Sequence, residues 1–323
     1  MTRVSTINTV GRTAVVALGG NAISDPSSDN SIASQFAHTR KSMVGVIELI
    51  HKGYRLAITH GNGPQVGESM LRMERALDVC PPRPLGVVVA DTQGSIGYMI
   101  EQSLLNGLRW QGITKQVVTL VTQVVVDQND PEMLNPSKYI GKAYTKSEAE
   151  KLGDKHDWLI REDAGRGFRR VVGSPIPLVI INKAAIRQLL DLGYVVICSG
   201  GGGIPVFIMA NGFYEGVDAV IDKDRAAAIL ARDIGAQDLF ILTAVEKVAL
   251  NYGKPNRQDL DRLSVSEATE HLAAGQFPPG NMGPKIEAAI HFLESGGERA
   301  LISSVEAVLD AVHGETGTWI LPD

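Results

Sequence analysis

The feature of this sequence that most constrains its fold is a repeating unit made of a short apolar run, a glycine turn and an amphipathic helix. Residues 14–18 (AVVAL) run into Gly-Gly-Asn, and residues 55–59 (RLAIT) run into His-Gly-Asn-Gly-Pro. Between these runs lie apolar residues with the i, i+3, i+4, i+7 spacing of one helix face: Met43, Val46, Ile47 and Ile50. Strands that alternate with helices in this way predict an α/β fold with a mainly parallel sheet and helices on both faces.

Three later runs extend this pattern, and one segment interrupts it. Residues 116–127 (QVVTLVTQVVVD) predict one long buried strand, and residues 194–198 and 238–243 predict two more. The segment from about 139 to 173 is rich in charge and glycine. A segment this polar is expected to be an insertion rather than a layer of the core, either a lid or a plain surface excursion.

Composition and charge bear on three questions: nucleic-acid binding, membrane insertion and cellular location. The chain has a net charge of -5 and a sequence pI near 5.8, whereas a domain that follows nucleic-acid phosphates is normally basic. No apolar run approaches the roughly 20 residues that span a bilayer. Residues 1–12 lack the apolar stretch of a signal peptide, and we interpret them as a flexible leader. Two cysteines, Cys80 and Cys198, are too few for a disulfide framework, so we expect a cytoplasmic protein without nucleic-acid or membrane partners.

Three glycine clusters follow expected strands: Gly19 with Gly20, Gly61 with Gly63, and residues 200–203. In parallel α/β folds, ligands bind at the carboxyl ends of strands. Glycines there let backbone N–H groups approach an anion, and the start of a following helix adds its dipole. A single cluster is more simply a turn, but three at equivalent strand ends favour a cradle for a phosphate or a carboxylate.

The signatures of several common enzyme classes are missing. There is no G-x-x-x-x-G-K-[ST], which argues against a P-loop enzyme, and the loop after Thr59 has the spacing G-x-G-x-x-x-G, one residue away from the dinucleotide fingerprint. A dinucleotide-binding oxidoreductase is therefore a weak alternative. No Ser-His-Asp set and no metal-ligand spacing is recognisable, so we expect no metal held by the protein itself. We interpret His60 as a hydrogen-bonded structural residue.

Two lysines fall in the first turns of expected helices. Lys223 and Asp224 begin one such helix, and Lys285 follows a glycine loop and Pro284, which suits a first helical position. An exposed lysine is slightly disfavoured at a helix start. Both lysines make sense if they face a phosphoryl group, because charge neutralisation supplies much of the catalysis in phosphoryl transfer. For Lys223, a solvated helix start capped by Asp222 is an equally good interpretation.

Ten motifs, spread over almost the whole chain after residue 12, carry a more specific signal. They are 17–22 (ALGGNA), 59–67 (THGNGPQVG), 92–98 (TQGSIGY), 122–127 (TQVVVD), 135–138 (NPSK), 162–167 (EDAGRG), 200–206 (GGGGIPV), 220–224 (VIDKD), 251–255 (NYGKP) and 282–288 (MGPKIEA). In content and order these motifs resemble those of the carbamate kinases, which have the amino-acid-kinase fold.

The resemblance implies a three-layer α/β/α sandwich with a mainly parallel central sheet and a protruding subdomain. A single domain, 13–323, would follow the leader 1–12. Its N-terminal lobe, about 13–213, would hold the acceptor, with segment 139–173 inserted as a mobile lid. Its C-terminal lobe, about 214–323, would hold the nucleotide.

The resemblance also implies roles for particular residues. Carbamate and the travelling phosphoryl group would be bound by Gly19, Gly20, Asn21, Gly61, Asn62 and Gly63. Lys223 and Lys285 would neutralise the phosphoryl group and Asp224 would orient them. Lys138, at the root of the subdomain, would substitute for a first-strand lysine of related kinases, whose place is taken here by Ala17. The adenosine part of the nucleotide would be bound by Thr243, Tyr252, Gly253, Lys254 and Met282.

The implied activity is reversible phosphoryl transfer between ATP and carbamate, carried out by a homodimer. The reaction would run towards ATP and would use carbamoyl phosphate from arginine catabolism. A carbamate oxygen is already anionic, so no general base is needed and the enzyme must suppress repulsion between two anions. Mg²⁺ would arrive on the phosphates of ATP or ADP.

The sequence differs from the family motifs at two positions, and two alternative functions are compatible with it. Gly173 stands where we expect proline or another small residue, and Gly283 stands where we expect leucine. Either difference could change the acceptor preference. A kinase for another small acylate or phosphate is one alternative. A paralogue that binds nucleotide without catalysis is the other, and retention of the three lysines and Asp224 argues against it.

Overall fold

The computed structural model describes residues 9–323 apart from 25–28, 30, 157 and 279. Its centre is an eight-stranded sheet in the order β15-β17-β16-β12-β1-β2-β9-β3. In that order the strands span Arg262–Ser264, Thr318–Leu321, Arg299–Ser304, Asp238–Thr243, Thr13–Leu18, Arg55–His60, Val195–Ile197 and Val117–Thr119. Neighbouring strands are parallel except β16 and β17, so the predicted mainly parallel sheet is confirmed.

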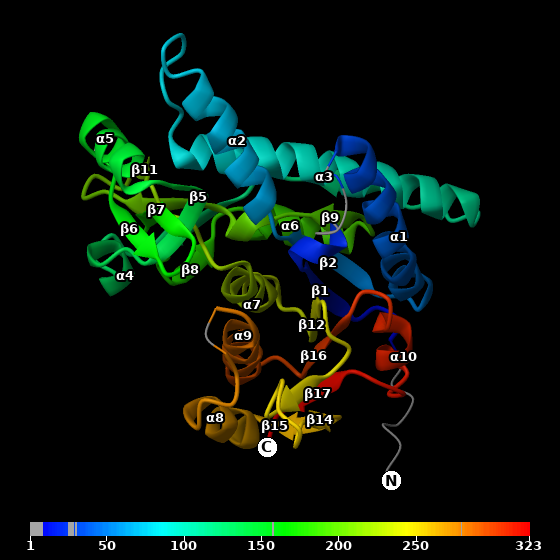
Figure 1. Ribbon diagram of the computed structural model, residues 1–323. Helices are drawn as coiled ribbons and strands as arrows, with labels where there is room; N and C mark the ends of the chain where they lie inside the picture. The colour runs from blue at the N-terminus through cyan, green and yellow to red at the C-terminus, as the bar shows by residue number, and fades with distance from the viewer. Residues whose placement is uncertain (1–8, 25–28, 30, 157, 279) are drawn as a thin grey trace.

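Helices cover both faces of this sheet and complete a three-layer sandwich (Figure 1). On one face lie α1 (Ile32–His51), α3 (Leu85–Trp110) and α10 (Val308–Val312). On the other lie α6 (Lys183–Asp191), α7 (Lys223–Ile234), α8 (Val265–Ala273) and α9 (Met282–Glu294). In the part of the chain that the structure describes, none of the helices is long and apolar enough to cross a membrane.

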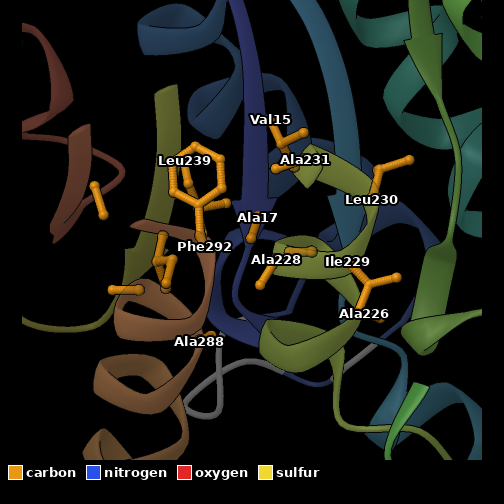
Figure 2. Packing of buried hydrophobic residues seen from close by; sticks show 14 of the residues in the cluster. Val15, Ala17, Ala226, Ala228, Ile229, Leu230, Ala231, Leu239, Ala288 and Phe292 are labelled. Atoms are coloured by element: carbon orange, nitrogen blue, oxygen red, sulfur yellow. The ribbon is translucent and has the colours of Figure 1, made fainter. Parts of the chain in front are cut away.

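Strand β1 explains why both faces must be covered. Its fully buried side chains alternate between two cores, with Ala14, Val16 and Leu18 on the α1 side and Val15 and Ala17 on the α7 side. Figure 2 shows Val15 and Ala17 packed against α7, whose contact face is built from alanines and short aliphatic residues. Small side chains let α7 lie close to β1. The first turn of α7 is thereby brought to the carboxyl end of the central strands.

A second sheet and a protruding subdomain extend from this core. The second sheet has the order β11-β10-β4-β8, spanning Tyr214–Gly216, Ile204–Ile208, Gln123–Val126 and Pro177–Ile180. The subdomain, at the left of Figure 1, consists of β5 (Lys138–Tyr144), α5 (Lys146–His156), β6 (Ile160–Asp163) and β7 (Gly167–Val172). It packs on α2 (Gly63–Arg75) and α3 through one apolar cluster: Val66, Met70, Leu85, Val88, Ile140 and Val172.

Short elements make the remaining connections. They are η1 (Gly20–Ala22), α4 (Pro131–Leu134), η2 (Gly200–Gly202) and the antiparallel pair β13 (Val248–Leu250) and β14 (Gln258–Leu260). The segment predicted as an insertion is thus an ordered α/β unit with its own small sheet, attached to the main body by β5 and β7.

The prediction of one strand over 116–127 is wrong. Strand β3 ends at Thr119 in the central sheet, and β4 begins at Gln123 in the second sheet. Gln93 of α3 holds the break: its amide oxygen accepts from the N–H of Thr122 at 2.7 Å and its amide nitrogen donates to the Thr122 carbonyl at 3.1 Å. A buried side chain therefore satisfies the N–H of Thr122 and shares its carbonyl with the N–H of Ile204 in β10, and the chain changes sheet.

The last residue of the expected leader is bound to the main body. Residues 1–8 lie outside the described residues, but Arg12 is bound to Asp238 at 2.8 and 3.0 Å. Arg299 donates to the same carboxylate at 2.7 and 3.0 Å. Asp238 is fully buried at the amino end of β12, so an ion pair anchors residue 12 to the central sheet.

Candidate active site

A cleft of about 580 Å³ opens at the carboxyl ends of the central strands. Its walls come from the loop after β2 and the first turns of α2, α7 and α9, together with the root of the subdomain. Seven residues predicted for the acceptor and for catalysis line it: Gly61, Asn62, Gly63, Lys138, Lys223, Asp224 and Lys285. Residues far apart in the sequence are thus brought to one place, because parallel strands all end at this edge of the sheet.

Two lysines from different helices converge on one carboxylate. The ammonium group of Lys223 donates to Oδ1 of Asp224 at 2.5 Å, and that of Lys285 donates to Oδ2 at 2.9 Å. Burial by itself would raise the pKa of Asp224, but the charges of the two lysines and their hydrogen bonds outweigh it and lower that pKa. Each ammonium has three N–H donors, so each lysine keeps donors for an anionic ligand.

Asp222 joins the start of α7 to the root of the subdomain. Its Oδ1 caps the helix by accepting from the N–H groups of Asp224 at 2.9 Å and Arg225 at 3.3 Å. Its Oδ2 lies 3.8 Å from Nζ of Lys138, which extends from the first residue of β5. The sequence indicated Asp222 as a cap, but nothing in it signalled the contact with Lys138.

The first two glycine clusters meet beside Lys223. A Cβ placed on Gly61 would lie 3.4 Å from the nitrogen of Gly20 and 3.6 Å from Cδ of Lys223. The N–H of Gly63, the first residue of α2, has no carbonyl of its own helix to bind, and Gly63 lies at the wall of the cleft. Gly19 differs from its neighbours, because its N–H already donates to the carbonyl of Leu242 at 2.8 Å. The backbone carbonyl of Asn21 contacts the ring of His38.

The third glycine cluster supports the second rather than forming a further row of N–H donors. The N–H groups of Gly202 and Gly203 are already bound to carbonyls within the same turn. A Cβ on Gly200 would lie 2.4 Å from Nε2 of His60, and a Cβ on Gly201 would lie 2.0 Å from Nδ2 of Asn62. The turn is glycine-rich because the loop after β2 packs directly on it.

His60 is the hydrogen-bonded structural residue that the sequence predicted. It is 1% exposed, and its Nδ1 lies 3.0 Å from the carbonyl oxygen of Gly61. Burial lowers the pKa of His60 to about 4, and the charge of Lys223 acts in the same direction. The imidazole is therefore neutral near pH 7, and Nδ1 carries the hydrogen that it donates to Gly61.

A second cavity, of about 160 Å³, lies next to the start of α9. Three residues predicted for the nucleotide line it: Thr243, Tyr252 and Met282. Phe277 and Lys247, which the sequence did not signal, complete an apolar wall and a charged edge. Asn281 lines both this cavity and the larger cleft, so the two meet at the residue before α9.

Seven of the residues singled out in the sequence do not line either cavity: Gly19, Gly20, Asn21, Gly173, Gly253, Lys254 and Gly283. Gly253 and Lys254 lie in the turn after Tyr252, where the N–H of Lys254 donates to the carbonyl of Asn251 at 2.9 Å. Gly173 packs against α4, since a Cβ there would lie 2.5 Å from Sδ of Met133. A Cβ on Gly283 would lie 3.2 Å from the carbonyl of Pro278. Their effect on acceptor preference stays a prediction.

The sequence also gave no signal for Arg169. It extends from β7 of the subdomain into the cleft wall, where its guanidinium donates to Asp163 at 2.9 Å and to the carbonyl of Gly141 at 3.0 Å. Arg169 and the three lysines Lys138, Lys223 and Lys285 outnumber the two carboxylates of the lining, Asp222 and Asp224, so the cleft carries a net positive charge. Among the residues that the structure describes, no group of three His, Cys, Asp or Glu side chains is placed to hold a metal ion. Such a cleft suits a transferred phosphoryl group, whose charge several fixed cations can stabilise.

The chain belongs to the amino acid kinase family, whose sequence model matches residues 12–304. Within that family its relatives place it with the carbamate kinases. The carbamate kinase of Pyrococcus furiosus is 44% identical over 315 residues, which cover 97% of this chain and 100% of that protein. The carbamate kinase-like protein YqeA of Escherichia coli is 48% identical over 310 residues, covering 95% of this chain and 98% of that protein.

A solved structure agrees with this placement. Carbamate kinase from Giardia lamblia bound to AMP-PNP matches the fold with a TM-score of 0.93 at 40% sequence identity, and the match covers 98% of this chain and 100% of that one. The protein is a kinase, and the resemblance seen in the ten sequence motifs is confirmed.

Proposed function

We propose that this kinase transfers a phosphoryl group reversibly between ATP and carbamate, forming ADP and carbamoyl phosphate. The observation that carries the proposal is the set of Lys223, Asp224 and Lys285 in a cationic cleft that meets a second cavity at Asn281. Relatives named carbamate kinase match the chain over nearly its whole length, which supports carbamate as the acceptor.

The acceptor would lie where the first two glycine clusters meet. Carbamate is a small planar anion, and backbone N–H groups of Gly20 and Asn21, with that of Gly63 at the start of α2, would bind its oxygens. The loop of Gly61, Asn62 and Gly63 would hold it beside Lys223, whose Cδ lies close to Gly61. Because the reacting oxygen is already anionic, no residue has to act as a base.

The lysines would stabilise the phosphoryl group during transfer. Lys223 and Lys285 would each use remaining N–H donors on its oxygens, while Asp224 keeps both ammonium groups in fixed positions. Lys138 would add a third positive charge from the subdomain, and its 3.8 Å contact with Asp222 holds it near the start of α7. Fixed cations are effective here because they need not reorganise as charge moves from one oxygen to the other.

The nucleotide would occupy the second cavity and extend past Asn281 into the cleft. Thr243, Tyr252 and Met282 would contact the adenosine part, with Gly253 and Lys254 at its exposed edge. Mg²⁺ would be carried into the cleft by the phosphate oxygens of the nucleotide. The protein offers it few ligands, because Asp224 is engaged by two lysines and Asp222 is then the one other carboxylate in the lining of the cleft. The ion would neutralise part of the phosphate charge.

Three further proposals concern the direction of the reaction, the location of the protein and its assembly. A direction towards ATP, from carbamoyl phosphate made in arginine catabolism, rests on the family resemblance. A cytoplasmic location is in keeping with two free cysteines, Cys80 and Cys198. A homodimer is supported by apolar side chains on the outer face of α3, where Val87, Tyr98 and Leu105 are 44%, 56% and 36% exposed. Their spacing of 11 and 7 residues puts them on one face of a helix.

The activity is tested by measuring ATP formation from ADP, Mg²⁺ and carbamoyl phosphate with the wild-type protein and with Lys223→Ala. We expect rapid turnover by the wild type and a loss of at least 100-fold in the variant, with folding unchanged. Near-normal turnover by Lys223→Ala would contradict the assigned role. Binding of ADP without turnover by the wild type would instead indicate a different acceptor or a retired enzyme.

A further inference from the structure

The side chain of Asn62, predicted to bind substrate, is held by the protein itself. Its Nδ2 donates to Oγ1 of Thr92 on α3 at 2.9 Å, and the residue is 9% exposed. Asn62 occupies the N-cap position of α2, yet its side chain makes no capping hydrogen bond. Its amide lies flat on Gly201, because a Cβ there would fall 2.0 to 2.6 Å from the three amide atoms. The acceptor loop is therefore clamped between a helix and a glycine turn.

The hydroxyl of Thr92 fixes which way this amide points. Thr92 is 2% exposed, and its single O–H donates to the carbonyl of Val89 at 2.8 Å. With its hydrogen used there, Oγ1 can only accept from Asn62. The amide nitrogen of Asn62 must then face Thr92 and the amide oxygen must face away. A hydroxyl outside the cleft thus determines the orientation of a side chain in its wall.

The next residue, Gln93, supports the glycine turn on which the same loop packs. Besides its two bonds to Thr122, its amide nitrogen donates to the carbonyl of Gly200 at 3.1 Å. Thr122 in turn accepts from the N–H of Ser199 at 3.1 Å. Thr92 and Gln93 are consecutive residues, so one rigid turn of α3 supports both the loop and the turn beneath it. All of these side chains are at least nine-tenths buried.

We propose that Thr92 is a positioning residue for the acceptor: acting through Asn62, it fixes the loop of residues 61–64 against Gly20 and Lys223. This inference rests on the proposed function, because it assigns the loop to the anionic acceptor. The loop leaves room for little more than one methyl group between Gly61 and its neighbours Gly20 and Lys223, so a shift of about 1 Å would displace the acceptor from the lysines. Misplacement of that size can lower a rate by about 100-fold.

The test compares Thr92→Val with Thr92→Ser and with a matched control, Thr39→Val. Thr39 is a fully buried threonine of α1 whose hydroxyl has no hydrogen-bond partner in the described structure, so the same change removes no bond there. For Thr92→Val we expect kcat/KM for carbamoyl phosphate to fall roughly 10- to 100-fold, while KM for ADP stays within about two-fold. Thr92→Ser and Thr39→Val should remain near the wild type.

A double-mutant cycle separates positioning from general loss of stability. If Thr92 acts through Asn62, Thr92→Val should have little further effect on kcat/KM in an Asn62→Ala background. Equal effects in both backgrounds would overturn the proposal, as would a Thr92→Val enzyme with normal acceptor kinetics. If Thr92→Val fails to fold, Thr92→Cys, whose sulfur accepts weakly, takes its place, and its kcat/KM should lie below that of Thr92→Ser. Equal values for the Cys, Ser and wild-type proteins would likewise overturn it.

Amide hydrogen exchange provides a readout that does not depend on the substrate. Peptides that cover residues 61–70 should exchange faster in Thr92→Val, by about 10-fold if the clamp contributes about 1.4 kcal/mol, and at the wild-type rate in Thr39→Val. If the wild-type protein does not use carbamoyl phosphate but this difference is found, the loop clamp stands and the assigned acceptor is wrong. Unchanged exchange in both variants would overturn the clamp itself.

Discussion

Asp224 accepts one hydrogen bond on each of its carboxylate oxygens, from Lys223 at 2.5 Å and from Lys285 at 2.9 Å. The two lysines are 62 positions apart in the sequence and belong to the first turns of α7 and α9, which pack against each other in the same layer. One buried carboxylate therefore sets the separation of two cations. The positions of both lysines in the cleft depend on it.

Replacing Asp224 with Asn should remove that control. The amide cannot accept two charge-assisted bonds, so two partly buried ammonium groups would repel each other without a counter-charge. We expect kcat for ATP formation to fall by at least 100-fold, with ADP affinity, measured by calorimetry, changed much less. An Asp224→Asn enzyme with more than a tenth of wild-type kcat would contradict this account.

Lys138 should matter for turnover more than for nucleotide binding. It reaches the cleft from the root of the subdomain and lies 3.8 Å from Asp222, away from the second cavity. Lys138→Met should lower kcat/KM for carbamoyl phosphate by roughly 100-fold, since it removes one phosphoryl-neutralising charge. Lys142→Met, an exposed lysine of the same strand, is the control and should behave as the wild type. Equal kinetics for the two variants would exclude a role for Lys138.

Adding one methyl group at Gly201 should displace the acceptor loop. The new Cβ would lie 2.0 Å from Nδ2 of Asn62, and the φ angle of 65° at this residue disfavours any L side chain. Gly201→Ala should therefore reduce kcat/KM for carbamoyl phosphate by at least 10-fold. Gly216→Ala, at an open position in β11, is the matched control. Loss of activity in both variants would point to a general effect of substitution instead.

His60 should make the fold sensitive to mild acid. Its pKa is about 4 in the folded protein against an ordinary 6.5, so the unfolded chain binds a proton that the folded protein does not. The free energy of unfolding should then fall as the pH drops from about 6.5 to 4, by at most about 3 kcal/mol. Urea unfolding at pH 7, 6 and 5 should show a shallower pH dependence for His60→Gln than for the wild type. The exposed control His51→Gln should keep the wild-type slope, and an unchanged slope in His60→Gln would refute the assignment.

Asp238 should affect stability without affecting the cleft. It is fully buried at the opposite ends of the strands and binds both Arg12 and Arg299. Asp238→Asn would leave the largely buried guanidinium of Arg299 without a counter-charge and Arg12 with only the exposed Glu298, which costs about 3–5 kcal/mol of unfolding free energy. Denaturant unfolding should show this loss, whereas KM values at a temperature where the variant is folded should be unchanged. A variant as stable as the wild type would show that the Asp238 ion pairs contribute nothing to stability.

Much of the fold could be predicted because its signals are local. The apolar runs of β1, β2, β9 and β12 stand between glycine turns and amphipathic helices, and parallel strands put their carboxyl ends together. Lys223 and Lys285 could be marked as candidates because a lysine in a first helical turn is unusual. The resemblance to carbamate kinases then predicted Lys138 at the subdomain root, which local patterns alone would not have found.

What could not be predicted depends on contacts between distant side chains. The run 116–127 has the pattern of one strand, and the break at Thr122 exists because Gln93 satisfies its backbone groups. The glycines of 200–203 looked like a ligand cradle, but their spacing against His60 and Asn62 is a packing requirement. Arg12 was placed in the leader because its partner, Asp238, lies 226 residues away.

The most direct test of the central claim is the rate of ATP formation from ADP and Mg²⁺ with carbamoyl phosphate, compared with acetyl phosphate under the same conditions. The two donors differ by an amino group in place of a methyl group, so the ratio of their kcat/KM values reports recognition of the acceptor part. We predict a kcat/KM for carbamoyl phosphate at least 10-fold above that for acetyl phosphate, since a site that binds a polar group discriminates against an apolar replacement. An equal rate with both donors, or turnover with neither despite ADP binding, would contradict the assignment of carbamate as the acceptor.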